Sequence, residues 1–258
     1  HPVVEKLISN DYEFIGNDII LDDKQFLSII TGPNMAGKRT YLRQIGIIVI
    51  MAQIGCFVSS DFSEIGLIDQ LFTRVGAGDN LAEGESTFLV EMQETANIIN
   101  NATSNSLILL DEIGRGTSTY DGLSIAWGVT EHIHDKIKAK TLFATHYHEL
   151  VELAENLDGA NNLNILVQES SDQSEIVFLR KIIQGGTDKS YGIYVAKMAG
   201  LPNSIIKKSK IYLELLTKKE NKVSLNYKEE IESIISKIND NQTDISQDFI
   251  NHLKQIDI

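Results

Sequence analysis

The chain has 258 residues, 42% of them hydrophobic and 23% charged. Its length allows one large α/β domain and a smaller appendage, and its composition is ordinary for a soluble globular protein. The formal net charge of −13 excludes a whole-chain electrostatic footprint for nucleic acid, so any DNA is expected to be held by residues outside this chain.

Targeting signals and cysteine usage set the expected compartment. No apolar run is long enough to span a membrane and no signal peptide is visible, so we expect a cytoplasmic protein without a membrane partner. The single thiol, Cys56, excludes an internal disulfide framework, and we interpret it as a small buried residue of an apolar helix. Because the chain begins at His1 rather than at a methionine, we expect a fragment of a longer protein.

The first predicted elements form a hairpin that leads into the core. Asn17–Leu21 predicts a strand, which turns at Asp22 and Asp23 into a buried apolar strand, Phe26–Ile30. Phe14 precedes the hairpin and has two interpretations, packing in the core or stacking on a nucleotide base.

The loop after this strand has the spacing of a P-loop. Gly32 is followed by four residues and then by Gly37 and Lys38, and the apolar segment Tyr41–Phe57 predicts a helix. Glycines let backbone N–H groups face a phosphate, the helix start adds positive charge, and Lys38 is expected to reach the β- and γ-phosphates. The loop residues that we expect at the nucleotide are Gly32, Pro33, Asn34, Met35, Ala36, Gly37, Lys38, Arg39 and Thr40.

One residue of this loop departs from the P-loop pattern. The position after the lysine normally carries Ser or Thr, whose hydroxyl ligates Mg²⁺, but it is Arg39 here and Thr40 follows one residue late. One residue rotates a helical position by about 100°, so Thr40 is not expected to substitute. The alternative interpretation of the loop is a glycine-containing turn that binds no ligand.

A glycine-punctuated loop and a helix follow. Ile65–Val75 predicts a strand, Gly76–Phe88 a loop, and Val90–Ala102 a helix. Ser86 is a natural N-cap for this helix. A serine at a helix start also suits an anion, but spacing alone favours the cap.

Two acids end the next apolar strand. Leu107–Leu110 predicts a buried strand, and Asp111 and Glu112 follow it in the Walker B pattern. Burying two carboxylates is costly, which favours a functional interpretation. We expect Asp111 to hold Mg²⁺, directly or through water, and Glu112 to orient or deprotonate the attacking water.

The following strand leads to a histidine. After a polar loop, Gly114–Gly122, and a predicted helix, Leu123–Ile137, the strand Lys140–Ala144 precedes His146. Ligands bind at the carboxyl ends of strands in open α/β sheets, so His146 is a candidate to sense or polarise a γ-phosphate. Three apolar strands that end in such turns predict a mainly parallel sheet flanked by crossover helices.

The remaining chain predicts an antiparallel strand pair and then helices. The strands are Gly159–Gln168 and Ser174–Ile183. A helix restarts after Pro202 with a basic face that we interpret as solvated, and the short helices that follow are expected to pack on a partner subunit. We therefore expect domains at residues 1–200 and 201–258.

Together these stretches resemble one known family, the ATPase domain of the MutS DNA mismatch-repair proteins. The resemblance covers about residues 1–217, and the run Asp111–Thr119 is highly specific for the family. The stretches that carry it are His1–Glu5, Thr31–Tyr41, Phe72–Ala77, Ser86–Met92, Leu110–Gly122, Ala144–Tyr147 and Ser190–Gly192.

The resemblance implies a P-loop NTPase fold of the ABC-ATPase type that binds ATP or ADP with Mg²⁺. It implies catalytic roles for Lys38, Glu112 and His146, the last as a switch histidine. It also implies that Phe14 stacks on the adenine and that Arg180 packs on the other face of the base.

The resemblance further implies a homodimer. Asn34 is then expected near the γ-phosphate, and the loop of Ser86 is expected to close over the nucleotide of the partner. The helices after Pro202 resemble a helix-turn-helix dimerisation element. Mismatched double-stranded DNA would be read and clamped by upstream domains absent from this chain, and downstream mismatch-repair proteins are expected partners.

Three functions are compatible with the sequence. The leading one is an ATPase that couples nucleotide state to a DNA clamp. A different ABC-type engine, such as a transporter subunit, is disfavoured because the chain lacks a Leu-Ser-Gly-Gly-Gln signature. The third is a nucleotide-binding or dimerisation module with little or no hydrolysis, because Arg39 replaces the Mg²⁺-ligating serine.

Overall fold

The computed structural model describes residues 1–7, 14–75, 86–169, 176–187 and 191–213. They belong to two compact units, His1–Lys189 and Ser190–Ile258, which we describe separately. The expected boundary at residue 200 stays a prediction, and the compact units divide before α6 (Gly192–Met198) rather than after it. Most of the predicted glycine-punctuated loop and all of the short helices after residue 213 lie outside the described residues.

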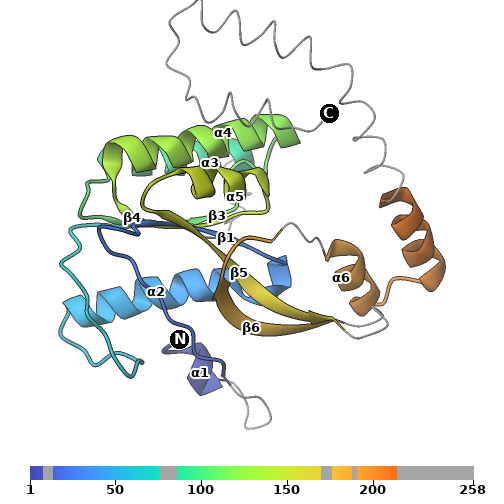
Figure 1. The fold of residues 1–258 in the computed structure, drawn as a ribbon, viewed down its shortest axis with the longest axis horizontal. Helices are drawn as coiled ribbons and strands as arrows, with labels where there is room; N and C mark the ends of the chain where they lie inside the picture. Colours follow the sequence, from blue (N-terminus) through green and yellow to red (C-terminus); the bar gives the residue numbers. More distant parts are fainter. Residues whose placement is uncertain (8–13, 76–85, 170–175, 188–190, 214–258) are drawn as a thin grey trace, which may run out of the picture. The chain divides into compact units, whose positions relative to one another are not determined.

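The described strands form one six-stranded sheet with the order β2-β3-β4-β1-β5-β6 (Figure 1). All neighbouring strands are parallel except β5 and β6, which run antiparallel. The α/β class, with a mainly parallel sheet and one antiparallel pair, is confirmed. The strands are β1 (Leu27–Thr31), β2 (Leu71–Arg74), β3 (Leu107–Asp111), β4 (Lys140–Ala144), β5 (Ala160–Glu169) and β6 (Ile176–Gln184).

Helices cover both faces of this sheet (Figure 1). On one face lies α2 (Lys38–Gln53), and on the other lie α3 (Thr87–Asn101), α4 (Thr119–His132) and α5 (Glu149–Asn156). The chain of α4 continues as a π-helical turn, η2 (Ile133–Ile137). Two further short segments are α1 (Val4–Leu7) and η1 (Asn34–Ala36).

The central strands β1 and β3 are buried along their whole length, which explains their mostly apolar sequences. Every residue of β1 and β3 is buried, and Tyr41, Leu42 and Ile45 of α2 pack against the sheet. Gly46 permits this close contact, since a Cβ atom there would lie 2.9 Å from Leu109 Cδ1. Packing of α2 therefore fixes the loop before it against the ends of the strands.

Two sequence predictions about this unit are wrong. Asn17–Leu21 is not a strand, and the segment is joined to β6 by a side chain, because Asn17 Nδ2 donates to the Arg180 carbonyl at 2.8 Å. A short apolar run such as Ile19–Leu21 does not distinguish this arrangement from a paired strand. The helix after the loop ends at Gln53, so Cys56 lies beyond it and is exposed rather than buried.

The second unit contains α6 and a further helix whose described residues are 203–213. Within it, Lys210 Nζ lies 5.1 Å above the ring of Tyr194, which accounts for one of its basic residues. Lys207 and Lys208 are exposed, as expected for a solvated face. Among the helices that the structure describes, none combines the length and apolar character needed to cross a membrane.

Candidate functional site

The P-loop lies between the end of β1 and the start of α2. Gly32 has a φ of 126° and Gly37 a φ of 111°, so both turns use backbone conformations that side chains disfavour. Between them η1 forms one tight turn from Asn34 to Ala36. Lys38 is the first residue of α2, so the loop ends at a helix N-terminus as the sequence predicts.

Lys38 is held inside this loop. Its side chain is almost fully buried, and its amine donates a hydrogen bond to the Gly32 carbonyl. Burial lowers the pKa of Lys38 below its ordinary value, while the charges of Glu112 and Asp111 act in the opposite direction. The ammonium group therefore lies within the field of both acids that follow β3.

The two acids reach the same edge of the sheet because β4 stands between β3 and β1. In this register Asp111 lies opposite Ala144, and Ala144 lies opposite Ile30. Glu112 follows with a φ of 57°, a strained value for a residue other than glycine, and its N–H donates to the Ala144 carbonyl at 2.8 Å. Both acidic side chains are at most 5% exposed.

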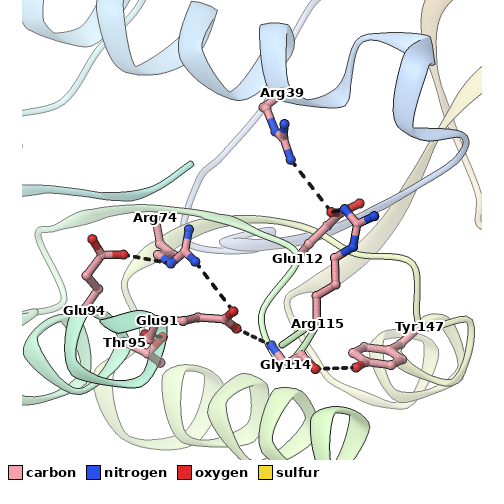
Figure 2. Close-up of polar contacts among 9 residues, drawn as sticks. All are labelled: Arg39, Arg74, Glu91, Glu94, Thr95, Glu112, Gly114, Arg115 and Tyr147. Carbon is pink, nitrogen blue, oxygen red and sulfur yellow. Dashed lines mark hydrogen bonds and ion pairs between the residues drawn. The ribbon is translucent and has the colours of Figure 1, made fainter. Parts of the chain in front are cut away.

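Arg39 joins the P-loop helix to these acids. Its Nε donates to Asp111 Oδ2. Its Nη2 lies 3.8 Å from Glu112 Oε2 (Figure 2). Arg115 contacts the same glutamate, with Nη1 2.6 Å from Oε2. The hydrogen bond and charge of Asp111 raise the pKa of Arg39. We call Arg39, Asp111, Glu112 and Arg115 the outer cluster, because the two arginine side chains are 50% and 58% exposed.

The residues at this place do not fit a Mg²⁺ ion. Mg²⁺ takes oxygen ligands at about 2.0–2.1 Å, whereas a guanidinium has donors only. Asp111 already accepts a hydrogen bond from Arg39. Thr40, the nearest hydroxyl in the sequence, lines a cavity beside Phe14 instead. Across the described ranges, no group of three or more His, Cys, Asp or Glu side chains is gathered to hold a metal.

His146 lies beside the outer cluster at the end of β4. Partial burial lowers its pKa, the charge of Glu112 opposes this shift, and the charges of Arg115 and Lys38 add to it. Its ring centroid is 4.1 Å from that of Tyr147. The role of His146 toward a γ-phosphate stays a prediction.

A second arginine cluster lies deeper in the molecule, and sequence reasoning missed it. Arg74 at the end of β2 contacts two acids of α3, with Nη2 3.6 Å from Glu91 Oε2 and Nε 2.8 Å from Glu94 Oε2. Glu91 accepts a 2.5 Å hydrogen bond from the Gly114 N–H, and Tyr147 Oη donates to the Gly114 carbonyl at 3.0 Å (Figure 2). We call Arg74, Glu91, Glu94 and Gly114 the inner cluster.

A cavity of about 280 Å³ adjoins the P-loop, and its lining includes no member of the outer cluster. The lining brings together Phe14, Arg180 of β6, and Met35, Gly37 and Thr40 of the loop and α2. Phe14 is partly buried and lines this cavity. Packing in the core and stacking on a base therefore both stay open as interpretations of this residue. The space suits a flat ring between an aromatic and a guanidinium group.

Ser86 stands apart from these contacts. It is the N-cap residue of α3, as predicted, but its side chain makes no capping hydrogen bond and the residue is exposed. In contrast, Ser118 caps α4 by accepting a hydrogen bond from the Asp121 N–H. Because Ser86 is exposed and does not cap α3, its hydroxyl can form a hydrogen bond with a ligand or with another molecule.

Two further residues, Arg115 of the outer cluster and Tyr147 beside the inner cluster, had a sequence signal that was not used. Arg115 follows Glu112 by three residues within a glycine-flanked loop, a spacing that brings it back to the acid. Tyr147 follows His146 directly and reaches Gly114. The pairing of Arg74 with Glu91 had no such signal, because it depends on how α3 packs beside β2.

Comparison with known proteins points to one family. The family described as MutS domain V matches residues 28–217. The chain is 59% identical over 224 residues to the DNA mismatch repair protein MutS of Chlorobium phaeobacteroides, covering 87% of this chain and 26% of that protein. It is 54% identical over 265 residues to that of Acetivibrio thermocellus, covering 100% and 30%. The chain thus spans less than a third of the length of these relatives.

Proposed function

The chain belongs to the MutS family and has its α/β P-loop fold, and from this premise we propose that it is the ATP-binding part of a DNA mismatch-repair protein. In this proposal the nucleotide state of the chain controls a DNA clamp formed by other parts of the whole protein. Hydrolysis is slow, because residue 39 is an arginine where the P-loop pattern has a metal ligand.

The observation that supports ATP binding most strongly is the meeting of the P-loop and the acids. Arg39 contacts Asp111 directly, although 72 positions separate them in the sequence. The loop provides left-handed glycines, a helix N-terminus and a buried lysine, which together suit a chain of phosphates. Glu112 lies at the same edge and is the candidate to orient the attacking water.

The base and the partner complete the proposed complex. The adenine is proposed to lie in the cavity lined by Phe14 and Arg180, beside the loop. Two copies are proposed to face each other so that Ser86 of one contacts the γ-phosphate held by the other, with His146 as the sensing residue. The exposed hydroxyl of Ser86 supports this arrangement. Downstream mismatch-repair proteins are proposed partners of the assembly.

A second candidate is a nucleotide-binding and dimerisation module that does not hydrolyse ATP. The contact of Arg39 with Asp111 favours it, because the acid that normally holds the metal is already paired. Both candidates predict that the chain binds ATP, but only the first predicts that it hydrolyses ATP.

Hydrogen exchange of the 258-residue chain tests the shared prediction. ATP is expected to slow exchange at the amides of residues 32–40 and at Glu112, and Lys38→Met is expected to weaken ATP binding at least about tenfold. Absence of protection at both segments would contradict the proposed site. Turnover measured on the same samples separates the two candidates, and Arg39→Ser is expected to raise it at least about tenfold.

A further inference from the structure

We propose that the Arg39 guanidinium takes the place of the divalent cation in this site, so that the chain binds the triphosphate of ATP free of metal. This inference rests on the proposed ATP site. It changes the ligand of that site from a metal–nucleotide complex to the nucleotide alone.

The position of Arg39 is the first support. It lies in the first turn of α2, directly after Lys38, and its guanidinium stands between this helix and the acids that follow β3. A cation that joins a phosphate loop to an acidic strand end has to occupy this space. In the outer cluster the space is taken by a covalently attached positive charge.

The charge balance is the second support. Among the described residues, the cations Lys38, Arg39 and Arg115 gather around two carboxylates, Asp111 and Glu112, and all five charges act within one small region. The surplus is positive before any ligand arrives. A polyanion is attracted to such a site, whereas a divalent cation is repelled by it.

The chemistry of the guanidinium is the third support. Arginine carries five N–H donors in a planar fork, so one edge can hold a carboxylate while another holds phosphate oxygens bidentately. Nε of Arg39 is the atom that holds Asp111, and the side chain is half exposed. Nη2 lies 3.8 Å from Glu112 Oε2, which is beyond hydrogen-bond distance, so the terminal nitrogens keep N–H donors with which they can bridge Asp111 to a phosphate, as a metal ion would.

Calorimetric titration of ATP into the full chain, once with EDTA and once with excess Mg²⁺, tests the proposal. For the natural sequence the two dissociation constants are expected to agree within about twofold. For Arg39→Ser, Mg²⁺ is expected to tighten ATP binding at least about tenfold, because a hydroxyl ligand and a free Asp111 become available. Arg39→Lys keeps the charge without the fork and is expected to bind metal-free ATP more weakly than the natural sequence.

Arg43→Ser is the matched control. Arg43 is an exposed arginine of the same helix, and its replacement is expected to leave the dependence on Mg²⁺ unchanged. The urea unfolding midpoint of each variant reports whether it is folded. The dissociation constants of ATP with EDTA and with Mg²⁺ are also compared in the natural sequence, and that comparison requires no variant.

Each outcome decides between the proposals. If Mg²⁺ tightens ATP binding to the natural sequence by about tenfold or more, the proposed role of Arg39 is overturned. The proposed ATP site is not contradicted by that result. The role of Arg39 is also overturned if the natural sequence binds no ATP while Arg39→Ser binds it with Mg²⁺. If neither protein binds ATP in either condition, the proposed function fails and the role of Arg39 fails with it.

Discussion

The outer and inner clusters pair arginine with carboxylate in opposite ways. In the outer cluster the acids are buried and the arginines are about half exposed. In the inner cluster the arginine is buried with Glu91, and only Glu94 is exposed. Water can replace the cation in the first case but not in the second.

This difference separates a contact that can be exchanged from one that holds the fold. Glu91 also accepts a hydrogen bond from the Gly114 N–H, so the inner cluster fixes the loop that follows Glu112 to α3. The start of α3 carries Ser86. The inner cluster therefore sets the distance between the acids and this serine, while the outer cluster leaves its arginines able to turn to a ligand.

The largest expected effect comes from removing each arginine in the same way. Arg74→Met leaves Glu91 buried without its cation and is expected to lower the free energy of unfolding by about 3–5 kcal/mol. Arg39→Met is expected to cost about 1 kcal/mol or less, because its side chain is half exposed and Lys38 and Arg115 still face the acids. Urea unfolding of both variants measures the difference, and equal losses would remove the distinction between the clusters.

A smaller effect is expected where Gly114 is closely packed. A Cβ atom at Gly122 would lie 2.1 Å from the Gly114 carbonyl oxygen and 2.2 Å from Tyr147 Oη, so Gly122→Ala is expected to cost about 1–3 kcal/mol. Gly128 lies in the same helix with open space around it, and Gly128→Ala is expected to stabilise the chain by about 0.5–1 kcal/mol. Thermal unfolding of the two variants is the measurement, and a loss at Gly128 or none at Gly122 would contradict this packing.

The smallest effect concerns the electrostatic neighbour of the outer cluster. The pKa of His146 is lowered from its ordinary value of 6.5, first by partial burial and then by Arg115, Lys38 and His148, against the charge of Glu112. The unfolded chain therefore binds more protons than the folded chain just below that pH, and stability falls as the pH drops through this window. We expect His146→Asn to lose less stability than the natural sequence between about pH 7 and about pH 5. Urea unfolding across this range checks it, and parallel curves would exclude a contribution from His146.

Much of the fold follows from local patterns in the sequence. The pattern predicts the strand Lys140–Ala144 to its residues, because its apolar end, Leu142–Ala144, is typical of a strand that is buried in a parallel sheet. The meeting of Lys38 with Asp111 and Glu112 is also predictable in outline, since parallel strands bring their carboxyl ends to one edge. The roles of these residues toward a nucleotide stay predictions.

The remaining features depend on tertiary contacts that no local pattern reveals. The pairing of Arg74 with Glu91 requires the packing of α3 beside β2, and the left-handed backbone of Glu112 requires its hydrogen bond to Ala144. The prediction for Cys56 is wrong because the apolar run in the sequence continues past Gln53, where α2 ends. The sequence shows that Arg39 departs from the P-loop pattern, but only the structure shows its contact with Asp111.

The side chain of Asn17 joins two segments that line the cavity beside the P-loop. It donates to the carbonyl of Arg180 and accepts from the N–H of Ile182. One side-chain amide therefore joins the edge of β6 to the segment that carries Phe14. Lys181 Nζ adds a further contact by donating to the Gly16 carbonyl at 2.9 Å, so side chains rather than a continuous backbone ladder hold these two walls of the cavity together. Because these contacts lie outside the hydrogen bonds of the parallel strands, their loss is expected to leave the register of the sheet unchanged.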